Sequence, residues 1–399
     1  MGFFLWAGRR VSRARQSASA SRLTKNRNSL NSLKRNRSWQ KMRIAQIAPL
    51  AESVPPKLYG GTERVVHWLT EELVQQGHEV TLFASEESRT SAVLAPVIPR
   101  ALRLGRPKQD PAAAYAALLA DLDERAQEFD VIHAHMDWLH LPLLCAKGVP
   151  FLTTLHGRID QPGLARVLKR FPGAHFISIS DNQRLPLPHL SWAGTVYHGL
   201  PERDLAAKFE RGRYLGFLGR LAPEKGAHTA ISLARRARQP LRIAAKIPRS
   251  QSRYVREQLL PQVDGEVIEL IGEVDDKGKT EFLANAAALL FPIDWPEPFG
   301  LVMIEAMACG TPVIAFRRGS VPEVIDDGVS GFVVDNEEEA LAAIARANEL
   351  DRRRVRAAFE ERFTAARMAR DYLAKYSQLI GSAESKSNNV AALSAGAVR

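Results

Sequence analysis

Residues 294–315 read DWPEPFGLVMIEAMACGTPVIA. Two glutamates, Glu297 and Glu305, stand eight positions apart, the first between two prolines and the second inside an apolar run. The proline after Glu297 favours an extended backbone at that glutamate and also suits the first position of a helix. Gly310 and Pro312 then end the helix before an apolar strand. We therefore expect Glu297 at the helix start and Glu305 about two turns further along.

The spacing of the two acids suits an elongated polar ligand. A helix from Phe299 to Glu305 rises by roughly 9 Å, which leaves one carboxylate at each end and the first helical amides between them. A solvated helix face would explain the spacing alone equally well. Glu305 lies between Ile304 and Ala306, however, and a charged side chain among apolar neighbours requires a partner. These surroundings favour a ligand site.

From Met42 onward, short apolar strands alternate with amphipathic helices, and the alternation occurs in two series. The first series predicts strands at 43–48, 79–84, 131–133, 151–155 and 175–179, with helices at 62–76 and 111–127. The second predicts strands at 214–218, 241–245, 267–271, 288–291, 313–315 and 332–334. Such alternation is typical of a parallel sheet covered by helices on both faces, so the fold class is α/β with two doubly wound domains.

The domain boundaries follow from changes in composition. The polar stretch 201–213 separates the two series, and a last helix is expected to cross back onto the first domain. Ligands of doubly wound sheets bind at the carboxyl ends of strands, which predicts a site in the cleft between the domains. The predicted parts are an extension at 1–41, a first domain at 42–205, a second domain at 206–363, a crossing helix at 364–380 and a disordered tail at 381–399.

Composition limits the class of protein. The chain has 399 residues, 45% of them hydrophobic and 25% charged, which indicates a soluble globular protein with more than one core. A run of eighteen apolar residues is absent, so we expect no transmembrane helix and a cytoplasmic location. The two cysteines, Cys145 and Cys309, imply no disulfide framework.

The positive charge is confined to one end of the chain. Residues 1–41 contain eleven Lys or Arg and no acid, which leaves 44 basic and 44 acidic residues in the body. This extension is rich in Ser and Asn, a composition typical of disorder. Three interpretations remain open: an organelle transit segment, a basic arm that binds anionic lipid or nucleic acid, or a non-native extension before a start at Met42. We favour the third.

A cationic turn follows the first strand of the second domain. Residues 219–226 read GRLAPEKG, so Arg220 leaves the strand end and Lys225 lies at the first turn of the next helix. A helix N-terminus favours anions, and a forked guanidinium beside an ammonium group suits a diphosphate. Two surface cations at an ordinary turn are the alternative.

In the first domain, glycines and histidines stand out. Gly60 and Gly61 precede the first helix and allow backbone amides to approach a phosphate or sugar, although a flexible turn explains them as well. The dinucleotide fingerprint G-x-G-x-x-G is absent after the first strand, which argues against NAD or FAD. His156 ends a buried strand that faces the cleft, either as a site residue or as a hydrogen-bonded structural histidine.

A metal site is the main rival within this domain. His133, His135 and Asp137 match the opening of the zinc-hydrolase motif H-x-H-x-D-H. The next position is Trp138 in place of the expected histidine, so one ligand is missing. Histidines at alternate positions of a strand end also share one face of a cleft without binding metal.

Together, the Glu297/Glu305 segment, the 219–226 turn, the Gly60–Gly61 loop and the Leu155-His156-Gly157 strand end resemble one family. They are similar to retaining glycosyltransferases of family 4, the group 1 glycosyl transferases, which have the GT-B architecture. The resemblance covers residues 42–380. It departs from the family at His198-Gly199, where Asn-Gly is common.

The resemblance implies a role for each matching residue. Arg220 and Lys225 would hold the donor diphosphate, Glu305 would accept hydrogen bonds from the ribose, and Glu297 and His156 would contact the transferred sugar. The implied catalytic residues are Glu297, His156, Arg220 and Lys225. The implied donor-binding residues are Gly60, Gly61, Gly219, Arg220, Lys225, Glu297, Gly300, Leu301, Val302 and Glu305.

The same resemblance implies a hexosyltransferase that needs neither metal nor cofactor. Its donor would be a nucleoside-diphosphate sugar, with UDP as the expected nucleotide, and its acceptor a hydroxyl group on a saccharide, a lipid-linked glycan or a small molecule. Polysaccharide biosynthesis, with peripheral contact at the inner, anionic face of the membrane and without nucleic acid, fits this interpretation. Two other classes remain: a metal-dependent hydrolase built on His133, His135 and Asp137, and a protein that binds nucleic acid or membrane through residues 1–41.

Overall fold

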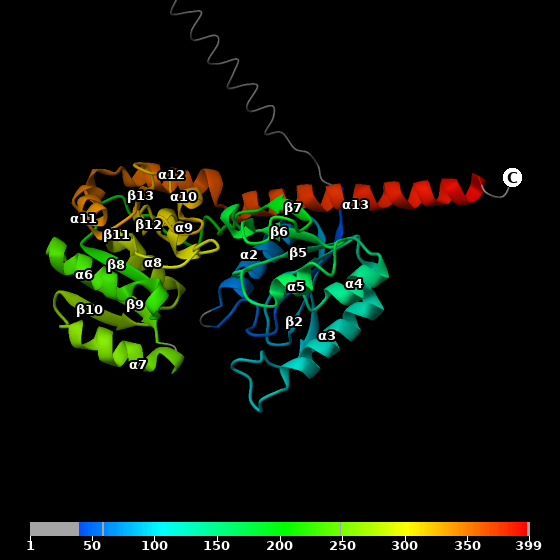
Figure 1. Cartoon of the computed structure of the whole chain (residues 1–399), viewed down its shortest axis with the longest axis horizontal. Coiled ribbons are helices and arrows are strands. Elements are labelled where there is room, and N and C mark those ends of the chain that lie inside the picture. The colour runs from blue at the N-terminus through cyan, green and yellow to red at the C-terminus, as the bar shows by residue number, and fades with distance from the viewer. Residues whose placement is uncertain (1–39, 58–59, 248, 397–399) are drawn as a thin grey trace, which may run out of the picture. The chain divides into compact units, whose positions relative to one another are not determined.

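Two parallel β-sheets, each with its own helices, form the framework (Figure 1). The computed structural model describes residues 40–57, 60–247 and 249–396. The first sheet has the order β3 (Val93–Ile98), β2 (Glu79–Ser85), β1 (Arg43–Ile47), β4 (Val131–Ala134), β5 (Phe151–Thr154), β6 (His175–Ser178) and β7 (Trp192–Thr195). The second has the order β10 (Ile268–Gly272), β9 (Leu241–Lys246), β8 (Tyr214–Arg220), β11 (Ala286–Phe291), β12 (Val313–Phe316) and β13 (Gly331–Val334). The predicted α/β class is confirmed.

The helices divide between the sheets. The first lobe comprises the first sheet with α2 (Gly61–Gln75), α3 (Pro111–Arg125), α4 (Leu141–Lys147) and α5 (Leu164–Leu168). The second lobe comprises the second sheet with α6 (Ala227–Ala237), α7 (Ser252–Tyr254), α8 (Asp276–Asn285), α9 (Leu301–Ala308), α10 (Val321–Val324), α11 (Glu337–Arg346) and α12 (Arg352–Arg362). The division of the chain at 205/206 itself stays a prediction.

The two strands that the sequence did not predict, β3 and β7, are the edges of the first sheet. Their residues are mostly exposed or half-buried, so they lack the continuous apolar run that marks the central strands. Pro96 lies within β3, as is usual for an edge strand, where a missing N–H breaks no internal ladder.

Apolar spacing explains how the second lobe closes its core. Ala227, Ala230, Ile231 and Ala234 recur at helical intervals on α6, and all four are fully buried against the sheet. The strands they cover, β8 and β9, are apolar over most of their length, as expected of a sheet buried on both faces. The polar side chains of the lobe are thereby left at strand ends and loops.

The chain returns to the first lobe at a tight backbone crossing. The N–H of Leu200 donates to the carbonyl of Phe363 (2.9 Å), and the N–H of Ala365 donates to the carbonyl of Leu200 (2.8 Å). A Cβ atom on Gly199 would lie 2.2 Å from the Thr364 carbonyl oxygen, so only glycine fits there. The glycine of the divergent His198-Gly199 pair is therefore required by this crossing.

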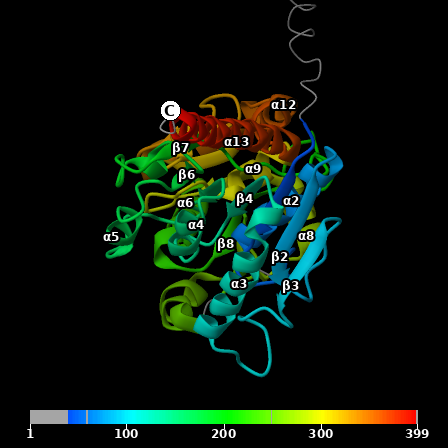
Figure 2. The ribbon, with the colours of Figure 1, turned by 90° about the vertical axis from the view of Figure 1, so that its right-hand side faces the viewer.

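After the crossing, α13 (Ala365–Gly396) packs on α2 and lies beside β7, as Figure 2 shows. Its Tyr372 and Tyr376 are fully buried. The sequence predicted a crossing helix at 364–380 and a disordered tail from residue 381, whereas α13 continues without a break to Gly396. Residues 382–396 contain no proline and several alanines, so nothing in them breaks the helix. The predicted extension at 1–41 lies outside the described residues, apart from its last two positions.

A buried arginine joins α12 to the second sheet. The Arg352 guanidinium donates to the carbonyls of Lys208 (2.9 Å), Ala286 (2.7 Å) and Ala284 (2.8 Å) and to the Thr311 hydroxyl (2.7 Å). The side chain is 7% exposed, so each of these acceptors depends on it in place of water.

Replacing Arg352 with Met should therefore leave three carbonyl oxygens and one hydroxyl without their hydrogen-bond donor. We expect a loss of at least about 3 kcal/mol of stability, because each unsatisfied buried group costs roughly 1 to 3 kcal/mol. Thermal unfolding of Arg352→Met against Arg354→Met, an exposed arginine on the same helix, measures the difference. Equal midpoints for the two variants would contradict this role.

His140 makes stability depend on pH. It is fully buried, its Nε2 pairs with the Thr153 hydroxyl at 2.7 Å, and burial lowers its pKa to about 3. Because the unfolded chain has the ordinary value near 6.5, the neutral ring stabilises the fold fully above about pH 6.5. That contribution is lost as the pH falls toward 3, at up to about 1.4 kcal/mol per pH unit.

We expect the thermal midpoint to decline from pH 7 to pH 5, and to decline less steeply in His140→Phe. Scans at half-unit pH steps on both proteins give the two slopes. Parallel slopes would show that His140 does not carry the effect.

Candidate active site

A single cavity of about 860 Å³ brings the predicted site residues together. It is lined by residues of both lobes, and all the positions predicted from the sequence lie on its wall. These are Gly60, Gly61, His156, Gly219, Arg220, Lys225, Glu297, Gly300, Leu301, Val302 and Glu305. Their chemical roles stay predictions. The structure nevertheless brings residues that are more than 240 positions apart in the sequence to one cavity.

Two cations stand on the second-lobe wall. Arg220 is the last residue of β8, and its Nε is buried without a hydrogen-bond partner among the described residues. Lys225 ends a short 3₁₀ turn, Pro223–Lys225, which precedes α6, so it lies just before the helix and not in its first turn as predicted. The unsatisfied guanidinium nitrogen indicates a place for an anion.

Lys225 is held by two residues of the loop before α9, Trp295 and Glu297. Its Nζ lies 2.5 Å from Glu297 Oε2 and 4.6 Å from the centre of the Trp295 ring, and Trp295 Nε1 donates to the same carboxylate oxygen at 2.7 Å. The Lys225 and Glu297 side chains are only 13% and 12% exposed. Each charge therefore compensates the other.

The loop that carries Glu297 is fixed from behind by Ser320. The Ser320 N–H donates to the Glu297 carbonyl and its hydroxyl donates to the Phe299 carbonyl, both at 2.9 Å. Gly300 follows with φ near +80°, in the left-handed region, and α9 begins at Leu301. The prediction that Glu305 lies two turns from the helix start is thus wrong, because the helix rises by only roughly 6 Å between Leu301 and Glu305.

Glu305 belongs to a chain of alternating charges. Lys279 Nζ lies 2.7 Å from Glu305 Oε1 and 3.2 Å from Asp276 Oδ1, and Arg64 Nη1 contacts both oxygens of Asp276 at 2.8 and 2.9 Å. Burial is the largest single influence on Lys279 and opposes its charge, but the Glu305 and Asp276 carboxylates together outweigh it, so the pKa of Lys279 is raised. The chain runs from α9 through α8 to α2 and links the second lobe to the first.

The sequence analysis missed Lys279, Asp276, Arg64 and Trp295. A local signal existed for two of them, since Asp276 and Lys279 are three apart at the start of a helix capped by Asp275. The Lys279–Glu305 contact joins separate elements, and no spacing rule predicts it.

The glycine loop lies opposite α9. Gly60 is the N-cap of α2 and provides no side-chain cap, and a Cβ atom on Gly61 would lie 3.6 Å from Leu301 Cδ1. A larger residue at Gly60 would also collide with Pro56, whose Cβ lies 2.8 Å from the added atom. Glycine at position 60 is thus required by the nearby Pro56, whereas a Cβ atom at Gly61 would make only an ordinary van der Waals contact with α9.

His156 lines the same cavity on the first-lobe side. Its Nε2 lies 2.8 Å from His135 Nδ1, and its ring stacks on His198 with centroids 5.3 Å apart. His198 in turn meets the edge of Phe299 at 4.8 Å, which joins the lobes through aromatic contact. Burial lowers the pKa of His156 to about 3, so the ring is neutral at neutral pH.

The proposed metal ligands are occupied by protein partners. His133 uses both ring nitrogens, on the hydroxyls of Tyr376 and Thr154 at 2.7 Å, and His135 uses both on His156 and Gln46 at 2.8 Å. Asp137 is exposed. Over the described ranges, no three His, Cys, Asp or Glu side chains are grouped as a metal would require. The hydrolase interpretation therefore has no free ligand set in these residues.

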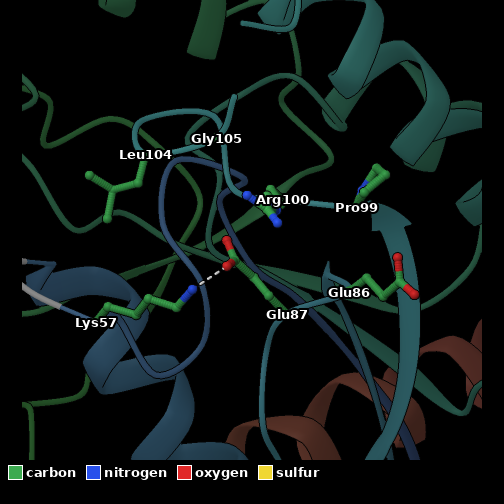
Figure 3. Close-up of a pocket in the computed structure, with 7 residues that line it drawn as sticks. All are labelled: Lys57, Glu86, Glu87, Pro99, Arg100, Leu104 and Gly105. Carbon is green, nitrogen blue, oxygen red and sulfur yellow. Dashed lines mark hydrogen bonds and ion pairs between the residues drawn. The ribbon is translucent and has the colours of Figure 1, made fainter. Parts of the chain in front are cut away.

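A second cavity of about 420 Å³ adjoins the first through Lys57, which lines both (Figure 3). Its wall carries Glu86, Arg100 and the ion pair of Lys57 with Glu87, and Glu87 also accepts from the Ala101 N–H at 2.9 Å. None of the residues predicted for the site lies on it.

Breaking the Lys279–Glu305 pair should destabilise the second lobe. Lys279→Met leaves a carboxylate that is 9% exposed without its cation, which we expect to cost about 2 kcal/mol or more. The exposed Lys277→Met on the same helix is the matched control. The double variant Lys279→Met/Glu305→Gln should recover most of the thermal midpoint, and additive losses would contradict the pairing.

Comparison with known proteins agrees with this geometry. The family described as Glycosyl transferases group 1 matches residues 202–362, and Glycosyltransferase Family 4 matches residues 59–185. D-inositol 3-phosphate glycosyltransferase of Frankia alni is 30% identical over 344 residues, covering 71% of this chain and 84% of the relative. Glycogen synthase of Mycobacterium tuberculosis is 27% identical over 363 residues, covering 76% and 87%.

Solved structures give the same fold. The Anabaena protein HepE, in complex with UDP and glucose, superimposes with a TM-score of 0.66 at 18% identity, covering 84% of this chain and 99% of that one. Within the described part of the chain, every helix is too short or too polar to cross a bilayer. The motifs, the paired α/β lobes and the relatives lead to one assignment: the chain belongs to the group 1, family 4 glycosyltransferases of GT-B fold, and it is a hexosyltransferase-type enzyme.

Proposed function

We propose that this enzyme transfers a sugar, with retention of configuration, from a nucleoside-diphosphate sugar to a hydroxyl acceptor. The observation that carries the proposal is the cavity wall on which Arg220, with a buried and unpartnered Nε, stands beside Lys225 and the two glutamates. The Anabaena relative in complex with UDP and glucose supports UDP as the nucleotide.

In this proposal the donor diphosphate lies between Arg220 and Lys225. Breaking the bond between the sugar and the phosphate places negative charge on the diphosphate, and fixed cations in a site shielded from water stabilise that charge strongly. Lys225 is already oriented by Glu297 and Trp295, so its charge needs little reorganisation. No metal ion is needed to supply this charge.

The remaining donor contacts follow along α9. Leu301 and Val302, the first two residues of the helix, line the cavity, and a helix start attracts phosphate and hydroxyl oxygens. Glu305 would accept hydrogen bonds from the ribose hydroxyls, and Glu297 from hydroxyls of the transferred sugar. The Gly60–Gly61 loop would close on the donor from the first lobe.

The second lobe, at 206–363, would thus bind the donor, and the first, at 42–205, would bind the acceptor. Retention would proceed by front-face attack. The acceptor oxygen bonds to the sugar carbon on the face that the phosphate leaves, and the acceptor proton passes to the departing phosphate oxygen. Glu297 is paired with Lys225 and would act by orienting the sugar, not as a nucleophile. The acceptor would be a hydroxyl group of a saccharide, a lipid-linked glycan or a small molecule.

The proposal is tested by incubating the purified protein with a panel of nucleotide sugars and measuring release of nucleoside diphosphate. Slow hydrolysis of one or more donors, without added metal, is the expected result. Anomeric NMR of the transferred product then reads the stereochemistry. Failure to bind or hydrolyse any member of the panel would refute the donor class.

Removing either cation should slow turnover with little effect on folding. We expect Arg220→Met and Lys225→Met to lower kcat at least about tenfold, because each loses a charge that stabilises the leaving diphosphate. Arg235→Met removes an exposed arginine from α6 and should leave kcat unchanged. Wild-type turnover in both cavity variants would refute the phosphate role.

A further inference from the structure

One ring nitrogen of a histidine that lines the cavity has no partner among the described residues. His156 Nδ1 is buried and unbonded within the described residues, although the ring lines the large cavity. Its other nitrogen, Nε2, meets His135 Nδ1 at 2.8 Å. A neutral imidazole carries one proton, so the chemistry that Nδ1 offers to a ligand is decided by the proton on Nε2.

We propose that a hydrogen-bond relay from Gln46 through His135 fixes the tautomer of His156, so that Nδ1 of this cavity-lining ring is left unprotonated, as a hydrogen-bond acceptor. Gln46, His135 and Tyr376 would thereby act as positioning residues for His156. The donor-sugar part of this inference rests on the proposed function, whereas the tautomer itself does not.

The direction of the relay follows from its first contact. The Gln46 amide places Oε1 at 2.8 Å from His135 Nε2, and an amide oxygen only accepts, so His135 carries its proton on Nε2. His135 Nδ1 is then a lone pair, and the atom facing it, His156 Nε2, must be the donor. The proton of His156 is thus committed to Nε2, and Nδ1 is left as a lone pair.

The amide nitrogen of Gln46 contacts the last helix. Gln46 Nε2 donates to the Tyr376 hydroxyl at 3.2 Å, and that hydroxyl contacts His133 Nδ1 at 2.7 Å. Tyr376 accepts from Gln46 and so donates to His133, which in turn donates from Nε2 to the Thr154 hydroxyl at 2.7 Å. Every contact of this relay therefore joins one donor to one acceptor.

Burial keeps the relay in a single protonation state. Gln46 and His133 are fully buried and His135 is 3% exposed. Burial, reinforced by the neighbouring imidazoles, lowers the pKa of His133 and His135 well below their ordinary values. The imidazole rings of His133, His135 and His156 therefore stay neutral at neutral pH. No additional proton reverses the donor and acceptor roles along the relay.

An acceptor at Nδ1 selects a hydroxyl that donates. On the proposed donor, one sugar hydroxyl would give its hydrogen to His156, and a fluorine at that carbon would not, because fluorine cannot donate. Among monodeoxyfluoro analogues of UDP-glucose, we expect one position to raise KM by about tenfold, the ratio that corresponds to roughly 1.4 kcal/mol for a lost hydrogen bond.

The direct test is the tautomer of His156 in the full chain. Protein labelled with ¹⁵N-histidine is examined at pH 8 by long-range ¹H–¹⁵N correlation, which separates protonated from unprotonated ring nitrogens, and His156→Gln assigns the signal by its loss. A proton on Nε2 is the expected result. A proton on Nδ1, or a mixture of the two tautomers, would overturn the proposal whether or not the protein transfers any sugar.

A variant then tests the source of the constraint. Gln46→Met removes both amide contacts, so the His156 tautomer should become mixed and the fluorine discrimination should shrink to about twofold. Tyr372→Phe is the matched control, because it removes a buried hydroxyl that contacts Thr154 at 2.9 Å but stands outside the path to His156. An unmoved tautomer in Gln46→Met would overturn the relay. If that variant does not fold, the wild-type spectrum decides.

Discussion

A charge buried beside this cavity must have an opposite charge within reach, and the site is built around that requirement. Lys225 is matched by Glu297 and Lys279 by Glu305, and both pairs are largely removed from solvent. The cost of taking these ions out of water is offset only while the partners stay together. Arg220 Nε departs from the pattern, since no partner satisfies it among the described residues. Among these groups the site therefore holds one positive group more than its carboxylates balance, and an anionic ligand would supply the missing negative charge.

The sequence predicted the fold almost completely where the pattern was local. Central strands are apolar throughout and helices have a repeating apolar face, so their positions agree with the structure to within one or two residues. The edge strands β3 and β7 were missed because half-exposed strands lack that pattern. The tail after residue 381 was predicted as disordered from its polarity, yet it contains no residue that ends a helix.

The site was predicted in membership but not in detail. The positions that the motif resemblance named all lie on the cavity wall, because most of them follow strand ends that the α/β topology brings to one edge. The resemblance did not predict Arg64, Asp276 and Lys279 on the same wall, nor which charges pair there. Lys279 reaches Glu305 from a different helix, and Trp295 reaches Glu297 through a bend fixed by Ser320. Such contacts depend on the packing of whole elements and leave no spacing in the sequence.

The last helix carries a consequence for the order in which the chain matures. Tyr372 and Tyr376 fill the interior of the first lobe and bond to side chains of β1, β4 and β5, more than two hundred positions upstream. During synthesis, the first lobe therefore leaves the ribosome before these two tyrosines are made, and its contacts with them form only after the second lobe has been synthesised. A fragment that stops at residue 205 would expose Gln46, His133 and Thr154 without their aromatic partners. The two lobes thus have separate sheets, but the first lobe cannot fold completely without the second, because α13 follows the second lobe in the sequence and supplies core residues to the first.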